Sequence, residues 1–161
     1  MTNAPLQVDY QVFLMASVAS VFDMVADHEQ VCRFVPNLEH GGIHHSEQGL
    51  LRLCDFGNDM VAQECIVRWQ PPSAFEYTML APNPFGIREH YATVTCQPYE
   101  SQAMTAHGTL LRWQHYFEHD DLDTMLSMLN TMFDHIFTEL IKQFHGYRLN
   151  NSAENKYFYQ Q

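Results

Sequence analysis

The chain has 161 residues, of which 46% are hydrophobic and 13% aromatic, a composition that supports one globular domain and excludes a disordered chain. Eight Lys and Arg residues against 19 Asp and Glu residues give a formal net charge of −11. This charge repels nucleic-acid phosphates and anionic membrane surfaces, so we expect neither as a partner.

The first residues show neither the basic nor the apolar region of a secretory leader, and no apolar run is long enough to cross a bilayer. The four cysteines are scattered without a CxxC pair, which is typical of reduced thiols. Both observations predict a cytoplasmic protein. The sequence has no HxH or HExxH pattern and no glycine-rich phosphate loop, so we expect neither a metal nor a cofactor.

In chain order, residues 7–15 alternate in polarity, which is typical of a strand. From Ser17 apolar residues recur at helical spacing, and a second short helical turn ends before Pro36. The chain therefore opens with one strand followed by a pair of helices.

The middle of the chain is predicted to form six strands, because alternating stretches are separated by turn signals. They are a polar strand between Gly41-Gly42 and Gln48-Gly49, and the ranges 50–57, 60–69, 74–80, 87–97 and 103–118. Consecutive strands with short turns favour an antiparallel meander. The path of the loop at 80–88 does not follow from its sequence.

The last predicted element is a long amphipathic helix, with apolar residues at every third or fourth position between Leu122 and Phe144. Asp120 or Asp121 can cap its start, and Gly146 can end it. One amphipathic helix facing one large sheet favours a sheet that wraps around that helix.

The organisation of the chain follows from these elements. We expect one domain over residues 1–146 and a loose polar tail over residues 147–161. No linker, repeat or low-complexity tract divides the domain. The tail holds one aromatic stretch, Tyr157-Phe158-Tyr159, whose side chains are suited to docking on the domain.

Three stretches of the sequence stand out by their order and spacing. They are VFDMVADHEQVCRFVP (21–36), LRLCDFGNDMVAQECIVRWQPPSAFEY (51–77) and GTLLRWQHYF (108–117). Together they resemble the START-like (SRPBCC) superfamily, specifically its polyketide cyclase/dehydrase group. The shared pattern is a helix pair, an Arg strand and a Glu strand joined by a Gly turn, a Pro-Pro turn, and a late strand with Thr and Trp.

The resemblance implies an α+β helix-grip fold, in which a curved antiparallel sheet of about seven strands wraps around the long C-terminal helix. The implied order is one strand, two helices, six strands and one helix. Members of this superfamily bind lipids, hormones, polyketides or aromatic metabolites between sheet and helix. Some of them catalyse cyclisation, dehydration or isomerisation there, so the fold alone does not settle the function.

Alternation along each strand predicts which side chains face the helix. Tyr77 and Met79 are expected to face inward on one strand. Leu111, Trp113 and His115 are expected to face inward on the last strand.

The strand at 60–69 gives conflicting signals. Its apolar pattern places the Val and Cys residues inward, whereas the resemblance places Glu64 inward. We follow the resemblance. The residues that it sets inward on this strand and the preceding one are Arg52, Cys54, Phe56, Ala62 and Glu64.

The strand at 87–97 carries a similar conflict. The resemblance favours Tyr91 and Thr93 inward, whereas apolarity favours His90, Ala92 and Val94. We again follow the resemblance.

Arg52 and Glu64 form the candidate polar site. Residues on the same face of adjacent antiparallel strands come within contact distance, and a charge buried among apolar side chains is costly unless it is paired. Such a pair can orient a carbonyl or hydroxyl group of a ligand, or transfer a proton through Glu64. The alternative is a cross-strand ion pair on the surface.

Aromatic, thioether and thiol side chains are expected to surround this pair, as is usual for small-molecule sites. The candidate ligand-binding residues are Cys54, Phe56, Ala62, Tyr77, Met79, Tyr91, Thr93, Leu111, Trp113, His115, Met125 and Met132. Ordinary core packing is the alternative for the aromatic residues and His115, and for the methionines.

These observations favour a protein that binds a small hydrophobic or aromatic molecule in a cavity between sheet and helix. The first alternative is a cofactor-free cyclase, dehydratase or isomerase, in which Glu64 acts as acid/base and Arg52 stabilises a developing oxyanion. The second alternative is a protein-interaction domain whose cavity is filled by side chains. An exposed sheet edge would also allow a homodimer.

Overall fold

The computed structural model describes residues 6–47 and 49–155. Its elements are β1 (Leu6–Leu14), α1 (Val18–Ala26), α2 (His28–Val31), β2 (His40–Ser46), β3 (Gly49–Asp55), β4 (Val61–Gln70), β5 (Ala74–Met79), β6 (Arg88–Ser101), β7 (Ala106–Glu118), α3 (Leu122–Phe144), β8 (Gly146–Arg148) and a short 3-10 helix, η1 (Ser152–Glu154). The eight strands form one sheet in the order β2-β3-β4-β5-β6-β7-β1-β8. The predicted antiparallel meander is confirmed from β2 to β7, and β1 then pairs with β7.

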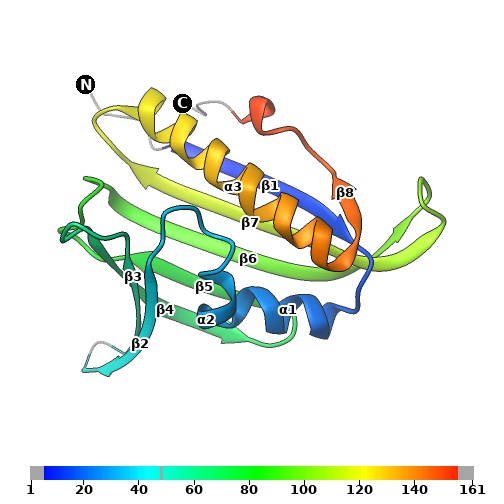
Figure 1. Cartoon of the computed structure of the whole chain (residues 1–161), viewed down its shortest axis with the longest axis horizontal. Helices are drawn as coiled ribbons and strands as arrows, with labels where there is room; N and C mark the ends of the chain where they lie inside the picture. Colours follow the sequence, from blue (N-terminus) through cyan, green and yellow to red (C-terminus); the bar gives the residue numbers. More distant parts are fainter. Residues whose placement is uncertain (1–5, 48, 156–161) are drawn as a thin grey trace.

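The sheet curves around α3, which lies along β1 and β7 (Figure 1). The two short helices pack on the same side, α1 against β6 and β7 and α2 against β2. The core lies between the helices and this inner face, where Tyr10 of β1 stacks on Phe133 of α3 with 4.3 Å between ring centroids. None of the described helices is both long and apolar enough to cross a membrane.

Capping residues define both ends of α3. Asp121 accepts a hydrogen bond from Thr124 N at 3.1 Å, and Asp123 places negative charge in the first turn. At the other end His145 adopts a φ of 61° and the helix stops. The buried residues of α3 recur at helical spacing and are Met125, Leu129, Phe133, Ile136, Phe137 and Leu140.

Residues 146–155, which follow α3, belong to the domain. Residues Gly146–Arg148 form β8, which pairs antiparallel with β1. Beyond it, Asn150 Oδ1 accepts from Gln11 N at 2.9 Å and Asn150 Nδ2 donates to Asp9 O at 2.7 Å, so one side chain replaces a strand at the edge of β1. The expectation of a loose tail is therefore wrong for residues 147–155. The aromatic stretch at 157–159 lies outside the described residues.

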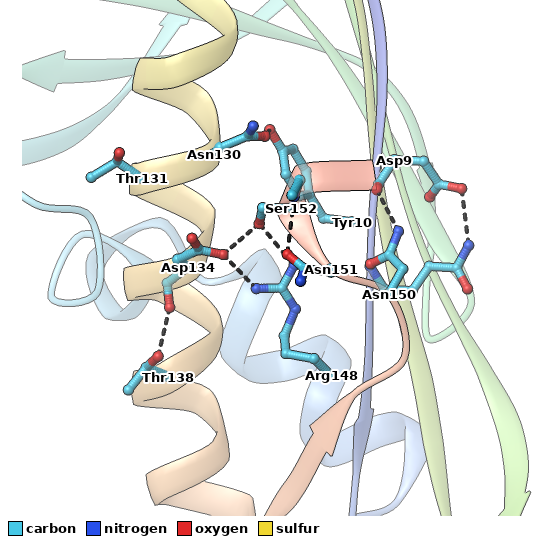
Figure 2. A network of polar contacts seen from close by, with 12 residues as sticks. Asp9, Tyr10, Asn130, Thr131, Asp134, Thr138, Arg148, Asn150, Asn151 and Ser152 are labelled. Carbon is cyan, nitrogen blue, oxygen red and sulfur yellow. Dashed lines mark hydrogen bonds and ion pairs between the residues drawn. The ribbon is translucent and has the colours of Figure 1, made fainter. Parts of the chain in front are cut away.

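A polar network fixes this segment to α3 (Figure 2). Arg148 Nη1 donates to Asp134 Oδ1 at 2.7 Å, and Ser152 hydrogen-bonds to both residues. The Arg148 guanidinium carbon also lies 4.8 Å from the centroid of the Phe137 ring. The segment is thus held by charge, hydrogen bonds and an aromatic contact, which its polar composition alone did not indicate.

Candidate functional site

The ladder between β3 and β4 places Arg52 directly opposite Glu64. Arg52 Nη2 donates to Glu64 Oε1 at 2.9 Å, and the two side chains are only 6% and 11% exposed. Burial by itself lowers the pKa of Arg52, but the charge and hydrogen bond of Glu64, together with Tyr77 and Cys54, outweigh burial, and the pKa is raised. The predicted pair therefore forms, and it is buried rather than on the surface.

Aromatic rings surround the guanidinium of Arg52. Its Cζ lies 4.6 Å from the centroid of the Tyr77 ring and 5.5 Å from that of Phe75. Trp113 Nε1 donates to Tyr77 Oη at 2.9 Å. Burial, with the negative charge of Glu64, raises the pKa of Tyr77, so the phenol keeps its proton.

Arg52, Glu64 and Tyr77 form a buried polar strip on the inner face, and two histidines extend this strip onto β6 and β7. His90 Nε2 lies 3.1 Å from His115 Nδ1, and His90 Nδ1 accepts from Met79 N at 2.9 Å. Both side chains are buried, and the Tyr77 ring lies 5.7 Å from the His90 ring and 6.3 Å from the His115 ring between centroids. Burial lowers the pKa of both histidines, that of His90 to about 4.

The loop between β5 and β6 packs against Phe56, the residue that follows β3. Phe85 of this loop meets Phe56 edge to face, with 5.2 Å between ring centroids. Asn83 organises the loop, because its Oδ1 accepts from the backbone N of Phe85 and of Ile87, both at 3.1 Å. His119 Nε2 donates to Phe85 O at 2.7 Å and ties the loop to the end of β7. The path that the sequence left open is thus set by two side chains.

Solved structures match this architecture at low sequence identity. The di-domain ARO/CYC protein StfQ of the steffimycin biosynthetic pathway aligns with a TM-score of 0.67 and 10% identity over 89% of this chain and 51% of that chain. The Aha1 dimer from Colwellia psychrerythraea gives 0.64 and 12% over 87% and 96%. Norcoclaurine synthase from Thalictrum, in complex with a transition-state analogue, gives 0.59 and 10% over 89% and 98%. No protein-family model and no curated protein sequence matches the chain.

The chain has the helix-grip fold. Its curved antiparallel sheet around α3 confirms the fold expected from the START-like resemblance, with eight strands rather than about seven because β8 adds to β1. Identities of 10% and 12% show the fold alone. The helix-grip superfamily includes both ligand-binding proteins and cyclases, so the site itself must carry the functional argument.

The conflict on β4 of the helix-grip sheet is resolved in favour of the resemblance. Ala62 and Glu64 are buried, whereas Val61 and Val67 are 40% and 51% exposed on the outer face. A carboxylate faces inward and valines face outward because Arg52 on the neighbouring strand supplies the opposite charge.

On β6 the prediction that followed the resemblance is wrong. Tyr91 is 39% exposed and donates a hydrogen bond to Glu76, which lies beside it on the outer face. Thr93 pairs with Glu76 across the ladder and is on the same face. Neither Tyr91 nor Thr93 faces α3.

His90 is the site residue that this interpretation missed. Ala92 lies opposite Tyr77 on one side and His115 on the other, and both of these face inward. Because side chains alternate along a strand, His90 faces inward with Ala92. The available signal was the alternation of buried residues at His90, Ala92 and Val94, which we set aside.

Most of the other predicted residues lie on the inner side of the helix-grip domain. Cys54 Sγ donates to Glu64 Oε1 at 3.8 Å. Trp113, Leu111 and Met125 are buried in the core. Met79 and Met132 are half-buried and pack against it.

No group of three or more His, Cys, Asp or Glu side chains in the described part of the chain is arranged to hold a metal ion.

A hollow in the surface lies apart from the buried polar groups. It has a volume of about 670 Å³ and lies over β4, β5 and the residues that follow β5, and its lining consists of Val61, Gln63, Cys65, Thr78, Leu80, Ala81 and Pro82. None of the buried polar groups described above lines this hollow, so we assign the candidate site to the inner face.

Proposed function

We propose that this helix-grip protein binds a small hydrophobic or aromatic molecule between the sheet and α3. The observation that carries the proposal is a buried strip of polar groups, from Arg52 to His115, on an otherwise apolar face. Arg52 Nε and His115 Nε2 are buried donors without a hydrogen-bond partner among the described residues. Folded proteins leave few such donors unpaired, so a bound molecule is the expected partner.

The energetics of the Arg52–Glu64 pair support the same proposal. Replacing a buried ion pair by packed apolar side chains is often neutral or stabilising, by up to about 4 kcal/mol. Stability alone therefore gives little reason to bury these charges. Binding of a ligand's carbonyl, carboxylate or hydroxyl group to these charges would give such a reason. The rings of Phe75, Tyr77 and Trp113 would contact the apolar part of the ligand.

A second candidate function is that of a cofactor-free cyclase, dehydratase or isomerase. It is supported by the charge of Glu64, which helps to raise the pKa of the Tyr77 phenol, and by Arg52, which contacts both the Tyr77 ring and the Glu64 carboxylate. In such a reaction Glu64 would remove or return a proton, and Arg52 would stabilise the developing oxyanion. Similarity to the ARO/CYC protein StfQ is a further support.

Native mass spectrometry of the freshly purified protein, compared with its denatured mass, tests the binding proposal. We expect a reproducible extra mass in the wild type, with occupancy about tenfold lower in Arg52→Met because a charge-assisted hydrogen bond is lost. Arg68→Met removes an exposed guanidinium from the same sheet and should retain the extra mass. A clean apo mass, with no uptake of added aromatic compounds, would favour the protein-interaction alternative instead.

Glu64→Gln separates binding from catalysis. A binding protein should keep its affinity within about threefold, because the amide still offers an acceptor to Arg52. An acid/base enzyme should lose turnover by about 10²- to 10⁴-fold. Unsaturated carbonyl compounds and polyketide-like compounds are the substrates to screen. Unchanged turnover in Glu64→Gln would rule out this residue as the acid/base.

A further inference from the structure

We propose that His115 donates a hydrogen bond from Nε2 to an acceptor oxygen of the bound molecule, such as the carbonyl of an aryl ketone, and that His90 holds His115 in the tautomer that can do so. The inference rests on the proposed function, because it names which polar group of the ligand meets which atom of the site. His115 would touch the ligand, whereas His90 acts through His115 and is a positioning residue.

The proton positions on both imidazoles follow from one backbone amide. The N–H of Met79 can only donate, and it meets His90 Nδ1 at 2.9 Å, so this nitrogen carries no proton. A neutral His90 then carries its proton on Nε2, which lies 3.1 Å from His115 Nδ1. Because His90 donates there, His115 Nδ1 accepts and the proton of His115 resides on Nε2.

The surroundings of this proton determine what it can bind. The His115 ring lies 5.2 Å from the Phe133 ring of α3 and 6.3 Å from the Tyr77 ring, between centroids. His115 Nε2 is buried and has no hydrogen-bond partner within the described ranges. An N–H enclosed by aromatic rings is satisfied by an acceptor, whereas a hydrocarbon or a second donor leaves it unpaired.

Both imidazoles are held neutral. Burial lowers the pKa of His115 well below its usual value, and the neighbouring His90 lowers it further. A proton on His90 Nδ1 would also face the Met79 N–H, donor against donor. A neutral donor favours an oxygen acceptor without attracting an anion, so the group expected here is an uncharged ketone, ester or lactone on an aromatic skeleton.

The compounds 1-indanone and indane form a matched pair for the test, because they share a bicyclic skeleton and only the ketone has an acceptor. Their dissociation constants are measured by chemical-shift titration of the labelled protein. We expect the wild type to bind 1-indanone about tenfold more tightly than indane, and His115→Phe to lose this preference. His107→Phe replaces an exposed histidine on the same strand and should keep it.

Imidazole nitrogen spectra of the wild type test the tautomers without any substitution. Long-range nitrogen–proton correlations at neutral pH should identify both His90 and His115 as Nε2–H forms. His90→Leu should release part of His115 into the Nδ1–H form and weaken the preference for the ketone. An Nδ1–H form of His115 in the wild type would overturn the inference.

The titrations distinguish this inference from the function on which it rests. Equal binding of 1-indanone and indane by the wild type, or an undiminished ketone preference in His115→Phe, would overturn the role of His115 and leave the proposed function standing. Binding of neither compound by the wild type would contradict the proposed function, and this inference with it.

Discussion

Arg52 and Glu64 lie opposite each other on β3 and β4, with 2.9 Å between Nη2 and Oε1 and little access to solvent. Removing one partner leaves the other as an uncompensated buried charge. Glu64→Ala should therefore lower the free energy of unfolding by about 3–5 kcal/mol, measured by urea denaturation. In the Glu64→Ala variant, Arg52→Ala should lower the free energy of unfolding far less than it does in the wild type. A double-mutant cycle should therefore show strong coupling between the two residues.

An exposed ion pair provides the control for this cycle. Arg88 Nη2 lies 3.0 Å from Asp120 Oδ1, but the side chains are 42% and 83% exposed. Solvent screening should limit the coupling of this pair to at most about 1 kcal/mol. Strictly additive effects of Glu64→Ala and Arg52→Ala would show that the buried pair is not a unit.

The histidine pair predicts how stability depends on pH. Burial lowers the pKa of His90 to about 4, whereas an unfolded histidine titrates near pH ~6.5. Between these values the unfolded state binds more protons than the folded state, so stability is full above pH ~6.5 and is lost as the pH falls towards 4. The loss from His90 alone should be about 3 kcal/mol.

The measurement is urea denaturation of the wild type and of His90→Gln between pH 7 and pH 4. Carboxylates contribute to the acid limb in both proteins, so the variant isolates the share of His90. Its stability should fall less steeply over this window. Parallel pH dependences would mean that the pKa of His90 is the same in the folded and the unfolded protein.

At the scale of elements, the segment after α3 is held by the Asp134–Arg148–Ser152 network (Figure 2). Arg148→Met should loosen this segment without unfolding the domain, because the salt bridge lies at its surface. The amide of Leu149, which donates to Gln11 O, should exchange hydrogen about tenfold faster.

The control for this experiment is a second cation of the same region. Lys142 Nζ pairs with Glu139 Oε1 at 2.9 Å, so its ion pair lies within α3 itself. Lys142→Met should leave the exchange of the Leu149 amide unchanged. An equal acceleration in both variants would mean that the network does not hold the segment.

Close strand packing predicts a contrast between two glycines. A Cβ at Gly108 of β7 would lie 2.2 Å from the backbone oxygen of Leu14, whereas nothing lies within 4 Å of one at Gly42 of β2. Gly108→Ala should therefore lower the free energy of unfolding by about 3 kcal/mol or more, and Gly42→Ala by less than about 0.5 kcal/mol. Thermal and urea denaturation measure both, and similar losses would contradict the packing described here.

Which side chains of each strand point towards the inner face of the sheet was only partly predictable. On β4 the resemblance identified Glu64 as inward, and the charge on Arg52 is the physical reason. On β6 the same reasoning failed for Tyr91, because the ladder places Ala92 between two inward residues. A strand that is polar on both faces gives no reliable sign of its orientation until its neighbours are known.

At the scale of the whole molecule, the net charge of −11 should govern non-specific contacts. Six of the seven Lys and Arg residues in the described part of the chain pair with carboxylates, so little positive charge is left there for a polyanion. We expect no binding to duplex DNA or to phosphatidylserine vesicles at about 50 mM salt, where such attraction is strong. Gel shift and vesicle co-sedimentation are the measurements. A salt-sensitive bound fraction would contradict the expectation.

Homodimerisation through an exposed sheet edge stays a prediction.

The sequence by itself determined the features that depend on neighbouring residues. Apolar spacing and capping residues set α3, turn residues set the meander, and one short turn brings Arg52 opposite Glu64. The tertiary structure alone decided the contacts between distant parts of the chain. It placed β8 on β1, turned His90 towards His115 and enclosed His115 Nε2. These contacts join residues with no local relation, so their partners become defined only when the sheet closes around the helix.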